Sequence, residues 1–243
     1  MQVLINSYLQ KHLSLSDADA QTLHQKYYKD YGLAVSGLVL HHKIDPLEFN
    51  KEVDDALPLE NIITPNPQLR QLLDDIDKSK VRLWLFTNAH ITHAQRVVKL
   101  LGVEDMFEGL TYCDYSKVPL HPKPHTEAYE KAEAESGVLS IQECFFIGKY
   151  INKKITSNRG VTVWLLICTL LTELNPDDSH LNCRYAQQRG WTTVHLLEPE
   201  DLEPEVKAAK HQIRDLEELR DVFPEIFKKD KSDPPHGSLN SQL

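Results

Sequence analysis

The chain has 243 residues, a mass of 27.9 kDa and 41% apolar residues, enough to fill one full-sized domain with a small accessory domain. Its 36 acidic and 27 basic residues give a net charge of −9, which opposes binding to the phosphate backbone of nucleic acids. No apolar run approaches the roughly 20 residues of a membrane span, and the first residues lack a signal-peptide pattern. We therefore predict a cytoplasmic protein, with a nuclear location left open, that binds neither nucleic acid nor membrane.

The first sixty residues are predicted to be helical. Apolar residues recur there at intervals of three and four, and Ser16 followed by Asp19 has the pattern of a helix N-cap. No stretch of strand-like alternation interrupts them. We expect residues 1–62 to form a helical domain.

From residue 63 onward, short apolar runs alternate with helical stretches, which favours a parallel sheet with crossover helices. The expected strands are 81–86, 109–113, 144–147 and 191–195. The expected helices are 69–76, 92–101, one that opens after Pro124, and 181–189. We expect an α/β core over residues 63–227, followed by a disordered tail, 228–243, that is almost free of apolar residues.

The first candidate site residues are Thr87 and Asn88, which end the apolar run 83–86. In an open α/β sheet, ligands bind beyond the carboxyl ends of the strands, where hydroxyl, amide and backbone N–H groups can hold an anion. The pattern therefore predicts a phosphate site at Thr87 and Asn88. The alternative is that the two residues merely begin a loop and cap the next helix.

Lys123 is the second candidate, because it lies between Pro122 and Pro124 just before a predicted helix. Proline restricts the backbone on both sides, so this lysine is a fixed charge suited to neutralising a phosphoryl group. The alternative is a solvated lysine in a rigid loop. We interpret the flanking His121 and His125 as loop residues, since no cysteine or glutamate nearby completes a zinc site.

Asp177 and Asp178 are the third candidate. A pair of carboxylates after a strand is typical of a magnesium site, because Mg²⁺ prefers oxygen ligands and keeps water and phosphate in its other positions. The alternative is an acidic cluster that caps the following helix, with Pro176 at its start. No apolar strand directly precedes this pair.

In chain order, these three features resemble the second, third and fourth motifs of the haloacid dehalogenase (HAD) superfamily of phosphohydrolases. The sequences that resemble its fungal-type pyrimidine 5′-nucleotidases are 27–32, 37–38, 83–89, 109–114 and 144–147. The resemblance implies a HAD-like Rossmannoid core with a helical cap, and a Mg²⁺-dependent phosphomonoester hydrolase. Its substrate would be a pyrimidine nucleoside monophosphate, and an aspartate would form an aspartyl-phosphate during turnover.

The resemblance also implies roles for individual residues. Thr87 and Lys123 would be catalytic, with Thr87 donating a hydrogen bond to the phosphoryl oxygens and Lys123 stabilising their charge. Thr87, Asn88 and Lys123 would bind the substrate together with Tyr31 and Gly32 of the cap. Asp177 and Asp178 would hold the metal.

The nucleophile itself is not found in this sequence. In the family an Asp-x-Asp motif ends the first core strand, ahead of the cap, whereas this sequence begins within the cap region. The nearby Asp17-Ala-Asp19 has the features of a helix start. We therefore expect a core that lacks its first strand and a chain that is inactive as it stands. The alternative is a non-catalytic relative that binds a phosphate ligand or a partner without turnover.

A segment of 29 residues, 148–176, separates the apolar run 144–147 from Asp177. It contains a basic patch and then an apolar run, 161–171. Removing it would join Ile147 to Asp177 and restore the family's strand followed by an acidic pair. Our hypothesis is a retained intron, and the alternative is a genuine insertion loop, which is unusual at this length.

The substrate is the least constrained prediction, because contacts from the cap select it. A sugar phosphate or a lysophospholipid headgroup stays open beside the nucleotide.

Overall fold

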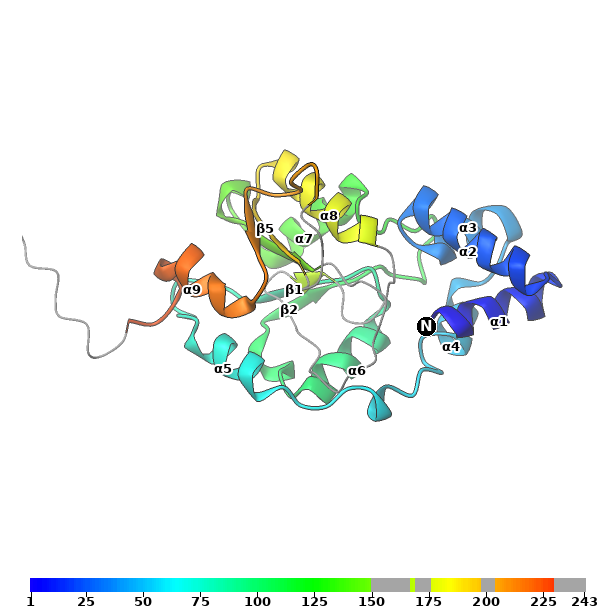
Figure 1. Ribbon diagram of the computed structural model, residues 1–243, viewed down its shortest axis with the longest axis horizontal. Coiled ribbons are helices and arrows are strands. Elements are labelled where there is room, and N and C mark those ends of the chain that lie inside the picture. The colour runs from blue at the N-terminus through cyan, green and yellow to red at the C-terminus, as the bar shows by residue number, and fades with distance from the viewer. Residues whose placement is uncertain (150–166, 169–175, 198–203, 230–243) are drawn as a thin grey trace, which may run out of the picture.

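Figure 1 presents the computed structural model, which describes residues 1–149, 167–168, 176–197 and 204–229. Most of the 148–176 segment and most of the predicted tail therefore lie outside the described residues. Of the helices in the described ranges, none combines the length and apolar character needed to cross a bilayer.

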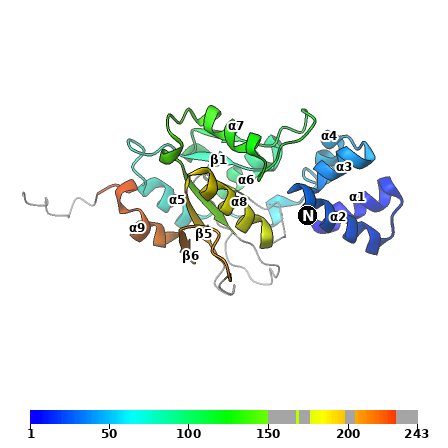
Figure 2. The ribbon, with the colours of Figure 1, turned by 90° about the horizontal axis from the view of Figure 1, so that it is seen from above.

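Four helices form the amino-terminal part of the chain, as predicted: α1 (Gln2–Leu13), α2 (Asp17–Tyr31), α3 (Ala34–His42) and α4 (Pro46–Glu52). Ser16 caps α2, because its hydroxyl accepts a hydrogen bond of 3.2 Å from the backbone N–H of Asp19. The Asp17-Ala-Asp19 sequence therefore begins a helix, which confirms that prediction. In both views these helices lie at one end of the molecule (Figures 1 and 2).

In the described residues that follow, a six-stranded sheet has the order β2-β1-β4-β3-β5-β6, and each of its strand pairs is parallel. The strands are β1 (Trp84–Phe86), β2 (Gly109–Thr111), β3 (Phe145–Lys149), β4 (Ile167–Cys168), β5 (Thr192–Leu196) and β6 (His211–Ile213). Helix α5 (Pro67–Asp75) precedes the strands, α6 (Ile91–Leu101), α7 (Thr126–Ser136) and α8 (Pro176–Arg189) lie between them in the chain, and α9 (Leu219–Val222) follows β6. The predicted α/β fold with a parallel sheet is confirmed.

Helices cover both faces of this sheet, with α5 and α6 on one side and α7 and α8 on the other (Figure 1). The strands are short, and their inward-facing residues pack into two apolar clusters, one with α5 and α6 and the other with α7 and α8. This layering brings the carboxyl ends of β1, β3 and β5 to one edge of the sheet.

The place between β1 and β3 holds β4, two residues of the 148–176 segment. Ile167 pairs with Leu85 of β1 and with Ile147 of β3, and Cys168 pairs with Gly148. The sequence predicts a core without its first strand, which would leave N–H and C=O groups of the neighbouring strands unpaired. The two described residues of this segment therefore form a strand inside the sheet, between β1 and β3.

A partly buried ion pair connects the carboxyl-terminal end of α8 to α7. Arg189 donates from Nε and Nη2 to the carboxylate of Glu133 on α7, at 2.7 and 2.8 Å, and the Trp191 indole N–H donates to the same carboxylate at 2.8 Å. Burial acts to raise the pKa of Glu133, but these hydrogen bonds outweigh it and lower the pKa. The contacts connect α7, α8 and the start of β5.

Candidate functional site

The carboxyl end of β1 delivers Thr87 and Asn88 to the edge of the sheet. Thr87 continues the ladder beyond the strand, since its N–H donates to Thr111 O at 2.9 Å. Its hydroxyl accepts from the N–H of Ala89 at 3.1 Å, which tightens the turn into α6. Both Thr87 and Asn88 are buried. The bond from Ala89 shows that Thr87 contributes to the turn, as the alternative predicted from the sequence requires. The Thr87 hydroxyl accepts in this bond, so its proton can still be donated to a ligand.

Lys123 lies against this strand end and is fully buried, with 0% of its surface exposed. Its backbone N–H donates to Asn88 Oδ1 at 2.7 Å, and its ammonium donates to Phe86 O at 2.8 Å. The same ammonium lies 4.2 Å from the centre of the Phe86 ring, within the range of a cation–π contact. The alternative of a solvated loop lysine is wrong, because this charge is held inside the protein by the end of β1.

The end of α2 meets the same place. Gly32 is the C-cap of α2 with φ of 71°, a left-handed conformation that glycine adopts without strain. The Asn88 side-chain amide donates to Gly32 O at 3.5 Å and to Lys123 O at 3.1 Å. Tyr31 points elsewhere, with its hydroxyl 2.5 Å from His41 Nε2. The structure thus brings Gly32 to Asn88 and Lys123.

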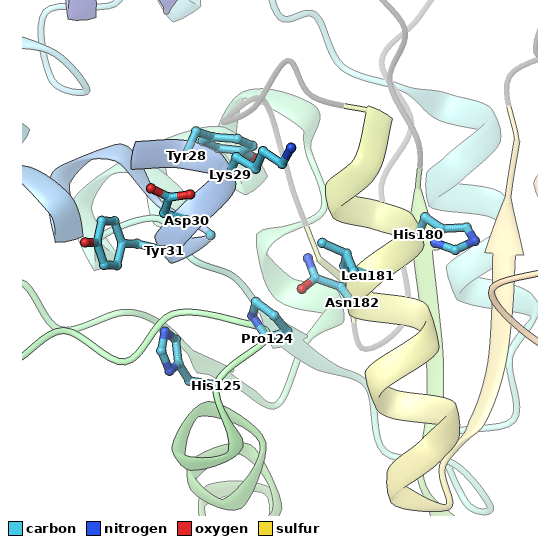
Figure 3. A pocket seen from close by; sticks show the side chains of 10 residues that line it. Tyr28, Lys29, Asp30, Tyr31, Pro124, His125, His180, Leu181 and Asn182 are labelled. Atoms are coloured by element: carbon cyan, nitrogen blue, oxygen red, sulfur yellow. The ribbon is translucent and has the colours of Figure 1, made fainter. Parts of the chain in front are cut away.

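A cavity of about 460 Å³ opens beside these residues (Figure 3). Three segments line it: the end of α2, the loop before α7 and the first turns of α8. The lining residues are Tyr28, Lys29, Asp30, Tyr31, Gly32, Pro124, His125, His180, Leu181 and Asn182. Of the predicted substrate residues, Tyr31 and Gly32 line the cavity. Thr87, Asn88 and Lys123 are not among its lining residues.

The residues contributed by α8 were not predicted from the sequence. Leu181 and Asn182 are directed toward the end of α2, and His180 points to the other side of α8 (Figure 3). The His180 ring lies 6.0 Å from that of His195 on β5. Burial, with a smaller contribution from His180, lowers the pKa of His195 to about 4, so this ring is neutral at neutral pH. The polar sequence at the start of α8 carries no apolar periodicity that could have identified these residues.

Asp177 and Asp178 lie in the first turn of α8, which begins at Pro176. They come 28 residues after Lys149, the last residue of β3. Their side chains are outside the described set, and the described histidines, cysteines, aspartates and glutamates form no group of three or more suited to a metal. The helix begins about five residues earlier than the sequence predicts, and the pair lies inside it.

Two of the buried cysteines, Cys113 and Cys144, are poorly suited to act as a nucleophile. Burial raises the pKa of Cys113 to about 12 and that of Cys144 to about 11. A thiolate, the reactive form, is therefore absent from both positions at neutral pH.

Comparison with known proteins decides the family. Residues 7–152, more than half of the chain, match the haloacid dehalogenase-like hydrolases. The chain belongs to this family. The HAD-like match spans the four amino-terminal helices and the part of the core that contains Thr87, Asn88 and Lys123.

One relative of this HAD-like chain is phosphate metabolism protein 8 of Saccharomyces cerevisiae, which is 38% identical over 156 residues. The alignment covers 60% of this chain and 48% of the yeast protein, so it spans about half of that relative. Two solved structures are also similar. A HAD phosphatase from Thermococcus onnurineus is 16% identical, with a TM-score of 0.49 over 90% of this chain and 86% of that one. A dehalogenase with an intermediate complex is 14% identical, with a TM-score of 0.47 over 93% of this chain and 92% of that one.

Proposed function

We propose that this HAD-like chain is a phosphomonoester hydrolase component whose substrate is a pyrimidine nucleoside monophosphate. The observation that carries the proposal is the assembly of Thr87 and Lys123 at the carboxyl end of β1, beside the cavity that α2 borders. A buried ammonium and a hydroxyl at a strand end are suited to a phosphoryl group.

In this proposal Lys123 neutralises the phosphoryl oxygens. Its ammonium is held by Phe86 O, so phosphate would take over a hydrogen bond that a neutral carbonyl now accepts. A charged acceptor forms the stronger bond, particularly where water is excluded. Tyr28 lines the α2 side of the cavity, where its aromatic ring suits a flat base.

Magnesium belongs to the proposal through Asp177 and Asp178, and it would neutralise the phosphate charge when bound. The alternative proposal is that the chain binds phosphate monoesters without hydrolysing them. In the first sixty residues, Asp17-Ala-Asp19 is the one Asp-x-Asp sequence, and it begins α2 instead of following a strand. A non-catalytic phosphate-binding protein is therefore the second candidate function.

Ligand titration tests the proposal. The chain is titrated with UMP, CMP, ribose 5-phosphate and glucose 6-phosphate by calorimetry in the presence of Mg²⁺. We expect UMP and CMP to bind at least tenfold more tightly than the sugar phosphates. Lys123→Met should weaken UMP binding at least tenfold, because it keeps the stem and removes the charge.

Lys117→Met is the matched control, since Lys117 is six residues away, exposed at the surface and paired with Asp114. It should leave UMP affinity unchanged. Equal or better binding of the sugar phosphates would remove the nucleotide part of the proposal. Release of phosphate from UMP by this chain would contradict the non-catalytic part, whereas binding without release would support it.

A further inference from the structure

Asn88 joins three segments that are far apart in the sequence. These are the end of α2 at Gly32, the end of β1, which carries Asn88 itself, and the loop before α7 at Lys123. Gly32 and Lys123 are 91 residues apart in the chain. We call this meeting point the Asn88 joint.

The side chain of Asn88 binds backbone on both sides. Its Oδ1 accepts from the Lys123 N–H at 2.7 Å, and its Nδ2 donates to Lys123 O at 3.1 Å and to Gly32 O at the longer distance of 3.5 Å. The first two bonds hold the peptide groups on both sides of Lys123 much as a neighbouring strand would. Asn88 is buried, and these bonds use both polar atoms of its side chain.

Steric contact at Gly32 supports the same joint independently of the long hydrogen bond. A Cβ atom at Gly32 would lie 2.5 Å from Lys123 O and 3.1 Å from the Pro124 ring. The backbone of α2 therefore approaches the Lys123 loop more closely than any residue with a side chain permits. Gly32 and Pro124 also line the cavity, so the joint forms part of its wall.

We propose that Asn88 is a positioning residue that couples the seating of the amino-terminal helices to the placement of Lys123. Its polar atoms hold protein backbone and leave the phosphate to Thr87 and Lys123. A shift of α2 over the cavity therefore moves the Lys123 loop, and a ligand held by Lys123 holds α2 in place. The ligand part of this inference rests on the proposed function, whereas the coupling itself does not.

Hydrogen–deuterium exchange on the full chain tests the coupling. Asn88→Ala should raise the exchange rate at least tenfold in the peptide that contains Gly32 and in the one that contains Lys123. Asn66→Ala is the control, because Asn66 also accepts from a backbone N–H, that of Leu69 at 3.0 Å, at the start of α5. It should leave both peptides unchanged. Peptides from β5 report any global loss of stability.

Asn88→Asp separates the two halves of the joint. It keeps the acceptor for the Lys123 N–H and loses the donor to Gly32 O and Lys123 O. We expect it to raise exchange mainly in the Gly32 peptide. Gly32→Ala disturbs the joint from the α2 side, because its Cβ would lie 2.5 Å from Lys123 O. It should raise the exchange rate in the Lys123 peptide. If Asn88→Ala affects only the Lys123 peptide, or Gly32→Ala leaves that peptide unchanged, the coupling is wrong.

The affinities for orthophosphate and for uridine provide a second measurement. A purely structural role of Asn88 would leave these affinities unchanged. Asn88→Ala should weaken both probes at least fivefold, because it releases Lys123 and the α2 wall together. Loss of orthophosphate binding with uridine binding retained would overturn the coupling. If the unaltered chain binds neither probe, the proposed function fails, and the exchange experiment still decides the joint.

Discussion

The Asn88 joint and the start of α8 differ in how the chain assembles them. Around Asn88, the candidate residues follow a strand end directly or lie in a short loop against it, and hydrogen bonds to backbone fix them. Asp177 and Asp178 lie instead in the first turn of a helix, 28 residues beyond the end of β3. Thr87 and Asn88 directly follow β1, whereas Asp177 lies nine residues after Cys168, the last residue of β4, and its position depends on where α8 begins.

The far end of α8 is well anchored, which sharpens the contrast. Cys183 and Ala186 are fully buried in the cluster with α7, and Arg189 binds Glu133. The helix therefore has a firm carboxyl-terminal half. While α8 stays packed in this way, its first turn fixes the position of the backbone at Asp177 and Asp178.

The largest expected effect is a pH dependence of stability at His195, which lies against His180 on α8. Its pKa of about 4 in the folded protein is below the ordinary value of 6.5. The unfolded chain thus takes up the proton first as the pH falls. This contribution to stability is complete above about pH 6.5 and decreases by roughly 3 kcal/mol as the pH falls toward 4. Urea unfolding, followed by tryptophan fluorescence, measures it.

The control for this effect is His195→Leu, which removes the titrating ring and keeps an apolar group of similar size. We expect a flatter dependence between pH 6.5 and 4.5. An unchanged slope in the variant would mean that His195 is not the group responsible.

The second effect concerns the anchor of α8. Glu133→Ala removes the acceptor of two bonds from Arg189 and one from Trp191, and we expect it to lower the free energy of unfolding by about 2 kcal/mol. Glu130→Ala is the matched control, because Glu130 lies on the same helix, 3.7 Å from the same arginine, and is 58% exposed. It should cost less than about 0.5 kcal/mol. Equal losses in the two variants would contradict a specific anchor.

The sequence predicted the larger features of the fold because those features depend on local patterns. The helix 92–101 and its end at Gly102 follow from apolar spacing and a glycine C-cap, and the structure has α6 at Ile91–Leu101 with Gly102 at φ of 72°. Strand β6 was not predicted, because His211–Ile213 has three residues and a single buried apolar side chain. Its place comes from pairing with β5, which is not visible in its own sequence.

The same reasoning explains the candidate site. Thr87 and Lys123 were found because a strand end and a pair of prolines are local signals. The contact between Gly32 and the Lys123 loop was not predicted, because it joins residues 91 positions apart through backbone atoms that no residue pattern identifies. His180 and Asn182 depend on where α8 begins, and the sequence predicts that helix about five residues too late.

The smallest expected effect on stability belongs to the acidic pair itself. An acid in the first turn of a helix stabilises it by about 0.3–1 kcal/mol, so Asp177→Asn should cost less than 1 kcal/mol in urea unfolding. If the pair acts only as part of the helix start, the variant should leave any affinity for Mg²⁺ unchanged. A chain that lacks residues 148–176 joins Ile147 to Asp177 and places the pair at the end of β3. That chain should bind Mg²⁺ more tightly, and Asp177→Asn should abolish the gain. Tight Mg²⁺ binding that depends on Asp177 in the full chain would instead place the acidic pair in the site beside Lys123, and the contrast between the two regions would disappear.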